Sequence, residues 1–159
     1  MWAPWRIGYV ESGVSDQDGC LFCRIAQSDD NAANLVLYRA GAAMVMMNLY
    51  PYNSGHLIIV PYAHQASPED LASDQLEDVW RLMQLSLGVV RRVLHPQGFN
   101  LGANLGAVAG AGIPDHFHMH LVPRWSGDTN FMPVLDDVKV IPEHLEQTYH
   151  RLRISFDAI

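Results

Sequence analysis

The sequence predicts an α+β fold in which an antiparallel sheet meander is packed by a long amphipathic helix and a C-terminal helix. Three observations lead to this fold class. Runs of β-prone residues separated by turn residues occupy positions 35–60, apolar residues recur at helical spacing over 76–94, and His alternates with apolar residues over 116–121. A length of 159 residues with 49% apolar content suits one core of ordinary size, so we expect residues 1–159 to form a single domain.

The sheet is expected to begin as a meander of three strands. Residues 35–38 and 42–47 are predicted to pair around a short turn, and residues 55–60 to form a third, apolar strand. This third strand follows a segment rich in the turn-forming residues Pro, Asn and Ser. Residues 99–105 and 117–122 are predicted to complete the sheet.

A long helix is predicted to follow the meander. Ser67 and Pro68 suit the N-cap and first position of a helix, because a Ser hydroxyl accepts a hydrogen bond from an unpaired backbone N–H and Pro has no N–H to satisfy. Apolar residues at helical spacing then continue to His95, after which a proline stops the helix. Trp80 and Met83 lie on the apolar stripe, and both are assigned to core packing.

The two ends of the chain are also expected to pack on the domain. Residues 1–13 form an N-terminal arm whose aromatic side chains, among them Trp2 and Trp5, need something to cover them. Residues from about 142 to 153 are predicted to form the C-terminal helix.

The run from His116 to Val122 is the most informative part of the sequence. In a strand, the period of two places His116, His118 and His120 on one face and apolar residues on the other. Each imidazole nitrogen needs a partner, and neutral His is neither strongly hydrated nor a good core residue. The alternative is an ordinary half-exposed strand, but three neighbouring His residues favour a face that carries chemistry.

A glycine-rich loop precedes this strand. Residues 102–112 contain four glycines among eleven positions, so their backbone N–H groups can approach an anionic ligand without interference from side chains. Such a loop by itself is more often a flexible turn between two strands. Because it adjoins the His face, we interpret it as a candidate phosphate-binding loop.

The chain contains two cysteines, Cys20 and Cys23, in a Cys-x-x-Cys motif. In a cytosolic protein this spacing indicates metal or redox chemistry rather than a structural disulfide. Two thiolates supply half of a tetrahedral zinc site, so two further ligands are required. The alternatives are a pair of buried small hydrophobic residues or a reduced pair that binds no metal.

Charge and hydropathy exclude several classes of partner. The net charge is −7 and Lys139 is the single lysine, so no basic stripe is available to bind a nucleic-acid polymer. A nucleotide remains compatible with this charge, because local imidazoles and backbone amides can outweigh a distant, screened field. No secretory signal and no apolar stretch of membrane-spanning length is visible, so we expect no membrane partner and a cytoplasmic location.

The run His116-Phe117-His118-Met119-His120-Leu121-Val122 resembles the histidine triad (HIT) motif, His-x-His-x-His followed by two apolar residues. Asn48, Pro51 and the segment Gly55 to Pro61 resemble the upstream hairpin of that family, and His64 falls where many members have a His. Two flanking segments, residues 2–6 and 123–131, resemble the bacterial branch that includes diadenosine tetraphosphate phosphorylases and hydrolases. The resemblance extends from Trp2 to about Arg153.

This resemblance implies an enzyme that cleaves dinucleoside polyphosphates at an α-phosphate. His118 matches the nucleophile, which would form a covalent nucleotidyl-histidine that phosphate or water then attacks. His120 matches the residue that contacts the phosphate oxygens. Asn48 matches the position that binds the ribose hydroxyls. His56 matches a supporting His behind the triad, although a satisfied core histidine is an equal alternative.

The same resemblance points to a phosphate-binding set in the glycine-rich loop. Asn104 is expected to offer a polar contact to phosphate, and Gly110, Ala111 and Gly112 to offer backbone N–H groups. Because Ala111 and Gly112 have no hydroxyl or amide side chain, the general acid for the leaving group is not assigned. The choice between phosphate and water as the acceptor is left open.

Zinc and a homodimer are further implications of the resemblance. In zinc-containing relatives the remaining ligands are His residues in the places of His64 and His116, so the expected site is Cys20, Cys23, His64 and His116. Four protein ligands leave no open position, so the zinc would be structural. No organic cofactor is expected. Members of the family are usually dimers with an extended sheet or packed helices at the interface.

Three alternatives have other consequences. The same nucleophile in another HIT hydrolase could cleave a different nucleotide conjugate, such as a nucleoside phosphoramidate or an adenylyl sulfate. The three triad His residues could instead bind one metal ion together, which predicts activity lost on chelation and no covalent intermediate. A nucleotide-binding module without turnover is the third alternative, and in it His118→Ala would behave like the wild type.

Overall fold

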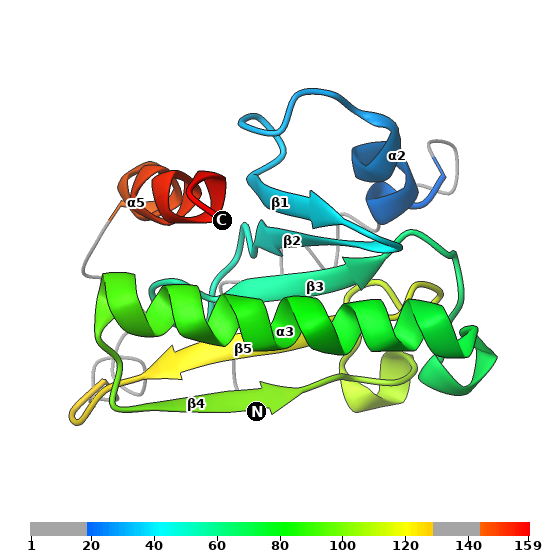
Figure 1. Ribbon diagram of the computed structural model, residues 1–159. Helices are drawn as coiled ribbons and strands as arrows, with labels where there is room; N and C mark the ends of the chain where they lie inside the picture. Colours follow the sequence, from blue (N-terminus) through cyan, green and yellow to red (C-terminus); the bar gives the residue numbers. More distant parts are fainter. Residues whose placement is uncertain (1–18, 129–143) are drawn as a thin grey trace.

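The computed structural model describes residues 19–128 and 144–159, which form an α+β fold around a five-stranded antiparallel sheet (Figure 1). The strands lie in the order β1-β2-β3-β5-β4. Their bounds are β1 Val36–Ala40, β2 Ala43–Met47, β3 Leu57–Pro61, β4 Gly98–Gly102 and β5 Met119–Arg124. The helices are α2 Leu21–Gln27, α3 Ser73–Leu94 and α5 Leu145–Asp157, with short 3-10 helices η3 Pro68–Asp70 and η4 Ala107–Ala109.

Helices cover both faces of the sheet, which explains why all five residues of both β2 and β3 are buried. Alternate residues of β2, such as Val45 and Met47, pack with α3 and α5 in one core cluster. Their neighbours Met44 and Met46 face the other way and pack with Phe22 of α2 in a second cluster. Helix α3 lies across the sheet face that it covers (Figure 1). The predicted fold class is therefore confirmed.

The start of the long helix is where the prediction was wrong. Ser67 and Pro68 do begin a helical turn, but it is the short η3, and Leu71 and Ala72 are extended before α3 starts at Ser73. Leu71 is buried in the main core cluster, and its burial interrupts the helical path that the local sequence favours. The Gln75 side chain accepts a hydrogen bond from the N–H of Ala72 at 3.1 Å and caps α3 there.

The other boundaries differ by a few residues. The predicted strand 99–105 ends at Gly102, because the chain then turns into the loop that the Asn104 side chain closes onto the carbonyl of Gly110 at 3.4 Å. Trp80 was wrongly assigned to the core: it is 49% exposed, whereas Met83 is buried as predicted. The buried apolar face of α3 is thus narrower at this helical turn than the sequence pattern indicates.

The loop between β2 and β3 is shaped by a glycine. Gly55 has a φ of +73°, and a Cβ at this position would collide with the Leu94 side chain at the end of α3. The loop therefore approaches α3 closely. It positions Asn48 and His56, two of the predicted site residues, at its two ends.

The two edges of the sheet are treated differently. Along β1, the Tyr149 hydroxyl donates to the carbonyl of Val36 at 3.1 Å and the Arg153 guanidinium to that of Leu37 at 2.6 Å, so side chains of α5 satisfy backbone groups there. The other edge is β4, which pairs only with β5 among the described strands.

In the two described ranges, no helix is long and apolar enough to cross a membrane. The predicted N-terminal arm, residues 1–13, and the predicted start of the C-terminal helix at residue 142 lie outside the described residues.

Candidate functional site

Of the three triad His residues, His120 lies in β5, and His116 and His118 lie in the segment just before it, on the sheet face that α2 covers. His116, His118 and His120 are all buried, and the Phe22 ring of α2 meets the first two edge-on, with ring centroids 5.3 and 5.0 Å apart. Their neighbour Met119 belongs to the core cluster on the opposite face. The prediction that the three imidazoles share one face is confirmed.

The nitrogen that carries the proton in His118 follows from its hydrogen bond. Its Nδ1 lies 2.9 Å from the backbone carbonyl of His116, and a carbonyl can only accept. Nδ1 therefore carries the proton, and in the neutral ring the lone pair is on Nε2. An imidazole in this state is a nucleophile at Nε2.

His120 has the opposite tautomer, and His56 imposes it. The backbone N–H of Tyr52 donates to His56 Nδ1 at 3.1 Å, which leaves the proton of neutral His56 on Nε2. His56 Nε2 lies 3.0 Å from His120 Nδ1 and donates to it. His120 then carries its proton on Nε2, where it is a donor. His56, itself fully buried, thus connects a backbone amide to the triad as a predicted supporting residue would.

Asn48 is next to the same network. Its carboxamide oxygen accepts the N–H of Tyr50 at 2.9 Å, and its amide nitrogen lies 3.4 Å from His56 Nδ1. The side chain is buried and held in one orientation by these contacts. A carboxamide oxygen has two lone pairs, and among the described residues the Tyr50 N–H uses one of those on Asn48, so the other can accept a hydrogen bond from a hydroxyl.

The glycine-rich loop offers fewer amides than predicted. The N–H of Gly110 donates to the carbonyl of Ala107 at 2.9 Å, and the N–H of Ala111 donates to that of Gly106 at 3.3 Å, so both are used inside the loop. Gly112 differs, since its N–H makes no hydrogen bond to another described residue. Gly112 is therefore the better placed of the three predicted donors.

A small cavity of about 80 Å³ brings the predicted residues together. His118, His120, Asn48, Asn104, Gly110 and Gly112 all line it, and Ala111 does not. The sequence reasoning missed the lining residues that come from α2 and from the loop after β2, namely Leu21, Phe22, Leu49 and Tyr50. The helical spacing of Phe22 and Ile25 was a signal for α2, but a helix of seven residues is too short for periodicity to detect.

The four predicted metal ligands converge beside the triad. The ligand atoms of Cys20, Cys23, His64 and His116 all lie within 4.8 Å of one another. His116 Nδ1 is 3.3 Å from His64 Nδ1, 3.3 Å from the Cys20 sulfur and 3.7 Å from the Cys23 sulfur. A tetrahedral zinc separates its sulfur and nitrogen ligands by roughly 3.3–3.8 Å, given bonds of about 2.3 and 2.0 Å. The donor set and its spacing therefore fit zinc.

The tautomer of His116 also fits metal binding. Its Nε2 lies 2.9 Å from the carbonyl of Pro61 and must donate to it, which leaves the Nδ1 lone pair directed at the cluster. Burial lowers the pKa of His116, and the neighbouring His64 and His118 lower it further, against the opposing bond to Pro61. Burial and the adjacent Cys20 thiol raise the pKa of Cys23, so a metal has to displace a proton from it.

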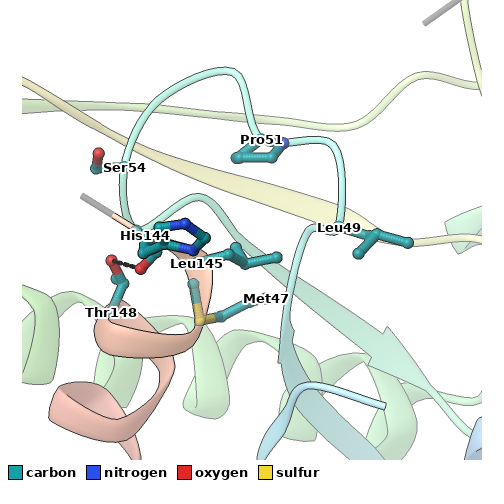
Figure 2. A pocket seen from close by; sticks show the side chains of 8 residues that line it. Met47, Leu49, Pro51, Ser54, His144, Leu145 and Thr148 are labelled. Carbon is teal, nitrogen blue, oxygen red and sulfur yellow. Dashed lines mark hydrogen bonds between the residues drawn. The ribbon is translucent and has the colours of Figure 1, made fainter. Parts of the chain in front are cut away.

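A larger cavity of about 320 Å³ lies on another side of Leu49, between the loop after β2 and the start of α5 (Figure 2). Pro51 of the loop and Leu145 of α5 contribute apolar walls, and the Thr148 hydroxyl is bonded to the carbonyl of His144 at 3.4 Å. None of the predicted site residues lines this cavity. We therefore identify the smaller cavity, which His118 and His120 line, as the candidate site because of its residues and not because of its volume.

Asp128, which follows the triad strand, has a structural role. Its carboxylate pairs with the Arg124 guanidinium at 2.6 Å and accepts hydrogen bonds from the Asn53 side chain at 2.8 Å and the Trp125 N–H at 3.0 Å. The hydrogen bond from Arg124 is the main cause that lowers the pKa of Asp128 to about 2. This cluster ties the loop after β2 to the turn after β5.

Comparison with known proteins agrees with this geometry. Residues 29–127, more than half of the chain, match the HIT domain. The chain belongs to the HIT family. It is 37% identical to the AP-4-A phosphorylase of Mycobacterium tuberculosis (strain ATCC 25618 / H37Rv) over 155 residues, which are 93% of this chain and 79% of that protein. The resemblance inferred from the motifs is thereby confirmed.

Two further proteins are also similar to this chain. An asymmetrical bis(5'-nucleosyl)-tetraphosphatase of Schizosaccharomyces pombe (strain 972 / ATCC 24843) is 29% identical over 93 residues, covering 58% of this chain and 50% of that protein. A crystal structure of a Zn-bound histidine triad family protein from Mycobacterium smegmatis superimposes with a TM-score of 0.71 and 23% identity, covering 88% and 94% of the two chains. The latter supports the fold.

Proposed function

We propose that this HIT protein cleaves dinucleoside polyphosphates of the diadenosine tetraphosphate type at an α-phosphate, with His118 as the nucleophile. One observation carries the proposal: the carbonyl of His116 holds the proton of His118 on Nδ1, and the side chain lines the candidate cavity. The tetraphosphate class is supported by the 37% identity to an AP-4-A phosphorylase.

The reaction divides into two displacements. His118 Nε2 attacks the α-phosphorus, an N–P bond forms, and the P–O bond to the departing nucleoside triphosphate breaks. Phosphate or water then attacks the same phosphorus and the N–P bond breaks, which returns neutral His118. With diadenosine tetraphosphate, the products are ATP with either ADP or AMP. We propose phosphate as the preferred acceptor, in line with the similarity to an AP-4-A phosphorylase.

The surrounding donors stabilise the phosphoryl oxygens in this scheme. His120 donates from Nε2, and its tautomer is set by His56. Gly112 contributes its backbone N–H, and Asn104, which is half-buried, contributes a side-chain amide. Asn48 accepts a hydrogen bond from a ribose hydroxyl with the remaining lone pair of its carboxamide oxygen.

Zinc completes the proposed holoenzyme. Cys20, Cys23, His64 and His116 would bind it, and their spacing supports this assignment. With four protein ligands the metal supplies a rigid link between α2 and the start of β5, and no reaction step is assigned to it. Two thiolate ligands require a reducing compartment, which supports a cytoplasmic location.

A homodimer is the proposed assembly. At one edge of the sheet, α5 satisfies carbonyls of β1, whereas β4 at the other edge has no strand beyond it in the described ranges. An unpaired edge is a ready site for a second copy of the chain. Leu101 of β4 is 45% exposed and would be covered by such pairing. With a net charge of −7, we propose no nucleic-acid polymer as a partner.

Intact-protein mass spectrometry tests the reaction. Wild type, His118→Ala and the control His150→Gln, which removes an exposed imidazole of α5, are quenched without acid after brief mixing with diadenosine tetraphosphate. We expect a single nucleotidyl adduct on the wild type and the control, which yields ADP when phosphate is added and AMP when it is not. An unmodified wild-type protein at every quench time, with the substrate bound and intact, contradicts the proposal. Adducts from an adenosine phosphoramidate or adenylyl sulfate, formed in preference, would reassign the substrate.

A further inference from the structure

His116 connects the Cys/His cluster to the nucleophile through three different atoms. Its Nδ1 faces the sulfur of Cys20 at 3.3 Å, and its Nε2 donates to Pro61 at 2.9 Å. Its carbonyl accepts the Nδ1 proton of His118 at 2.9 Å. The group that selects the tautomer of His118 is therefore the backbone of a residue whose side chain is a ligand of the proposed metal.

Helix α2 makes a second connection between the two sites. Cys20 and Cys23 flank Phe22 in the sequence, and the Phe22 ring is packed edge-on against both His116 and His118. The same ring lines the candidate cavity. Helix α2 has seven residues, and the Arg39 guanidinium donates to the carbonyls of Ile25 and Ala26 at its C-terminal end. Its N-terminal end has no side-chain hydrogen bond at the N-cap and is held by apolar packing.

We propose that the metal acts on catalysis at a distance, and that Cys20, Cys23 and His64 are positioning residues for His118. With the cluster loaded, the ring of His116 is fixed at both nitrogens, so its carbonyl stays where it holds the His118 proton on Nδ1. With the cluster empty, the Nδ1 anchor is lost and His118 divides between its two tautomers. Only one of them presents an Nε2 lone pair. This inference rests on the proposed function of His118.

The coupling should change turnover more than substrate affinity. The other groups assigned to the nucleotide, such as Asn48 and Asn104, lie on the loop after β2 and the loop after β4, not on α2. They stay in place when the cluster is empty. A smaller share of reactive His118 lowers kcat in proportion and leaves KM nearly unchanged.

His64 offers the cleanest perturbation because it is the exposed member of the cluster. Full-length wild type, His64→Ala and His64→Cys are compared, each with and without zinc, and His150→Gln serves as a matched loss of an exposed imidazole. Two quantities are measured: kcat and KM for diadenosine tetraphosphate, and the ¹⁵N signals of the His118 imidazole, which distinguish a protonated nitrogen from one that carries a lone pair. Far-UV circular dichroism monitors the fold.

We expect His64→Ala and the zinc-free wild type to lose kcat by about 10- to 100-fold, with KM changed by less than about threefold. The His118 signals should move toward a mixture of tautomers, and His64→Cys, which retains four ligands, should restore both readouts. Unchanged His118 signals in zinc-free protein overturn the proposal, as does a loss of kcat that only accompanies a loss of helical signal. A zinc-dependent change of tautomer in a protein that never forms the adduct contradicts the function of His118 and leaves the coupling intact.

Discussion

The three triad His residues lie in two different environments. His116 faces the Cys/His cluster, whereas His118 and His120 line the candidate cavity. His116 has one nitrogen bonded to a carbonyl, and its other nitrogen meets two sulfurs and a second imidazole. His118 and His120 also have their Nδ1 bonded to a protein group, but both side chains line a cavity. Four donors that face one another suit a structural ion, whereas imidazoles that line a cavity suit chemistry on a ligand.

The difference shows that the atoms placed against imidazoles two residues apart give them different proton positions. The Pro61 carbonyl leaves the lone pair of His116 on Nδ1, the His116 carbonyl leaves that of His118 on Nε2, and His56 leaves the proton of His120 on Nε2. These contacts fit the three roles proposed above, a metal ligand, a nucleophile and a phosphate donor, within the segment that leads into β5. The predictions below separate these roles, from the largest expected effect to the smallest.

Removing the proposed nucleophile, His118, should abolish turnover and leave zinc binding by the Cys/His cluster unchanged. His118→Ala is expected to lower kcat/KM for diadenosine tetraphosphate by at least about 10⁴-fold, because no other described group in the cavity has a comparable lone pair. Zinc content, measured by plasma mass spectrometry, should equal that of the wild type. A variant that lost its zinc as well would show that the two environments are not separable.

Removing a thiolate should give the reverse pattern. Cys23→Ser is expected to weaken zinc binding by about 100-fold or more, since a hydroxyl is a poor substitute for a thiolate ligand. Competition with a chromophoric chelator measures the affinity. Ser155→Ala, at a half-buried position of α5, serves as a control for a hydroxyl change away from both sites. Zinc bound as tightly as in the wild type would remove Cys23 from the ligand set.

Breaking the bond behind the triad should have an intermediate effect. His56→Phe retains an aromatic ring against Tyr52 but loses the Nε2–H that donates to His120 at 3.0 Å. We expect kcat to fall by about 10- to 100-fold, because His120 no longer keeps its proton on the nitrogen that serves phosphate. Single-turnover formation of the adduct is the measurement, with His150→Phe as the control. A wild-type rate would show that His56 is only a satisfied core histidine.

The smallest effect is expected outside both environments, at the ion pair between Arg124 and Asp128. This pair helps to connect the loop after β2 to the turn after β5. The pKa of Asp128 is lowered from 3.8 to about 2, so its stabilising contribution is complete above about pH 4 and is lost as the pH falls toward 2. Asp128→Asn should cost about 1–2 kcal/mol of unfolding free energy at pH 7, after allowance for the 40% exposure of Arg124.

Urea denaturation at pH 7 and at pH 3 measures this contribution, with the exposed Glu77→Gln as the control. The difference between Asp128→Asn and the wild type should shrink at the lower pH. Zinc content and adduct formation should not change. A difference that stayed constant with pH would mean that the carboxylate charge is not the source of the stability.

The sequence by itself determined the α+β class, the approximate extent of the five strands and the long helix, and the identity of the triad. These follow from local periodicity, since a period of two or of 3.6 is present in the chain before it folds. The pairing of Cys20 and Cys23 with His64 and His116 came from resemblance to a family, and their proximity in space agrees with it.

Only the tertiary structure decided which protons the imidazoles carry and which loop amides are available. The partners of His116 and His56 are a backbone carbonyl 55 residues away and an imidazole 64 residues away, and no local pattern encodes such contacts. The same holds for the amides of Gly110 and Ala111, which the fold of the loop uses internally. Leu71, whose burial delays the start of α3, shows the physical reason: packing between distant segments outweighs the few tenths of a kcal/mol by which local sequence favours one conformation.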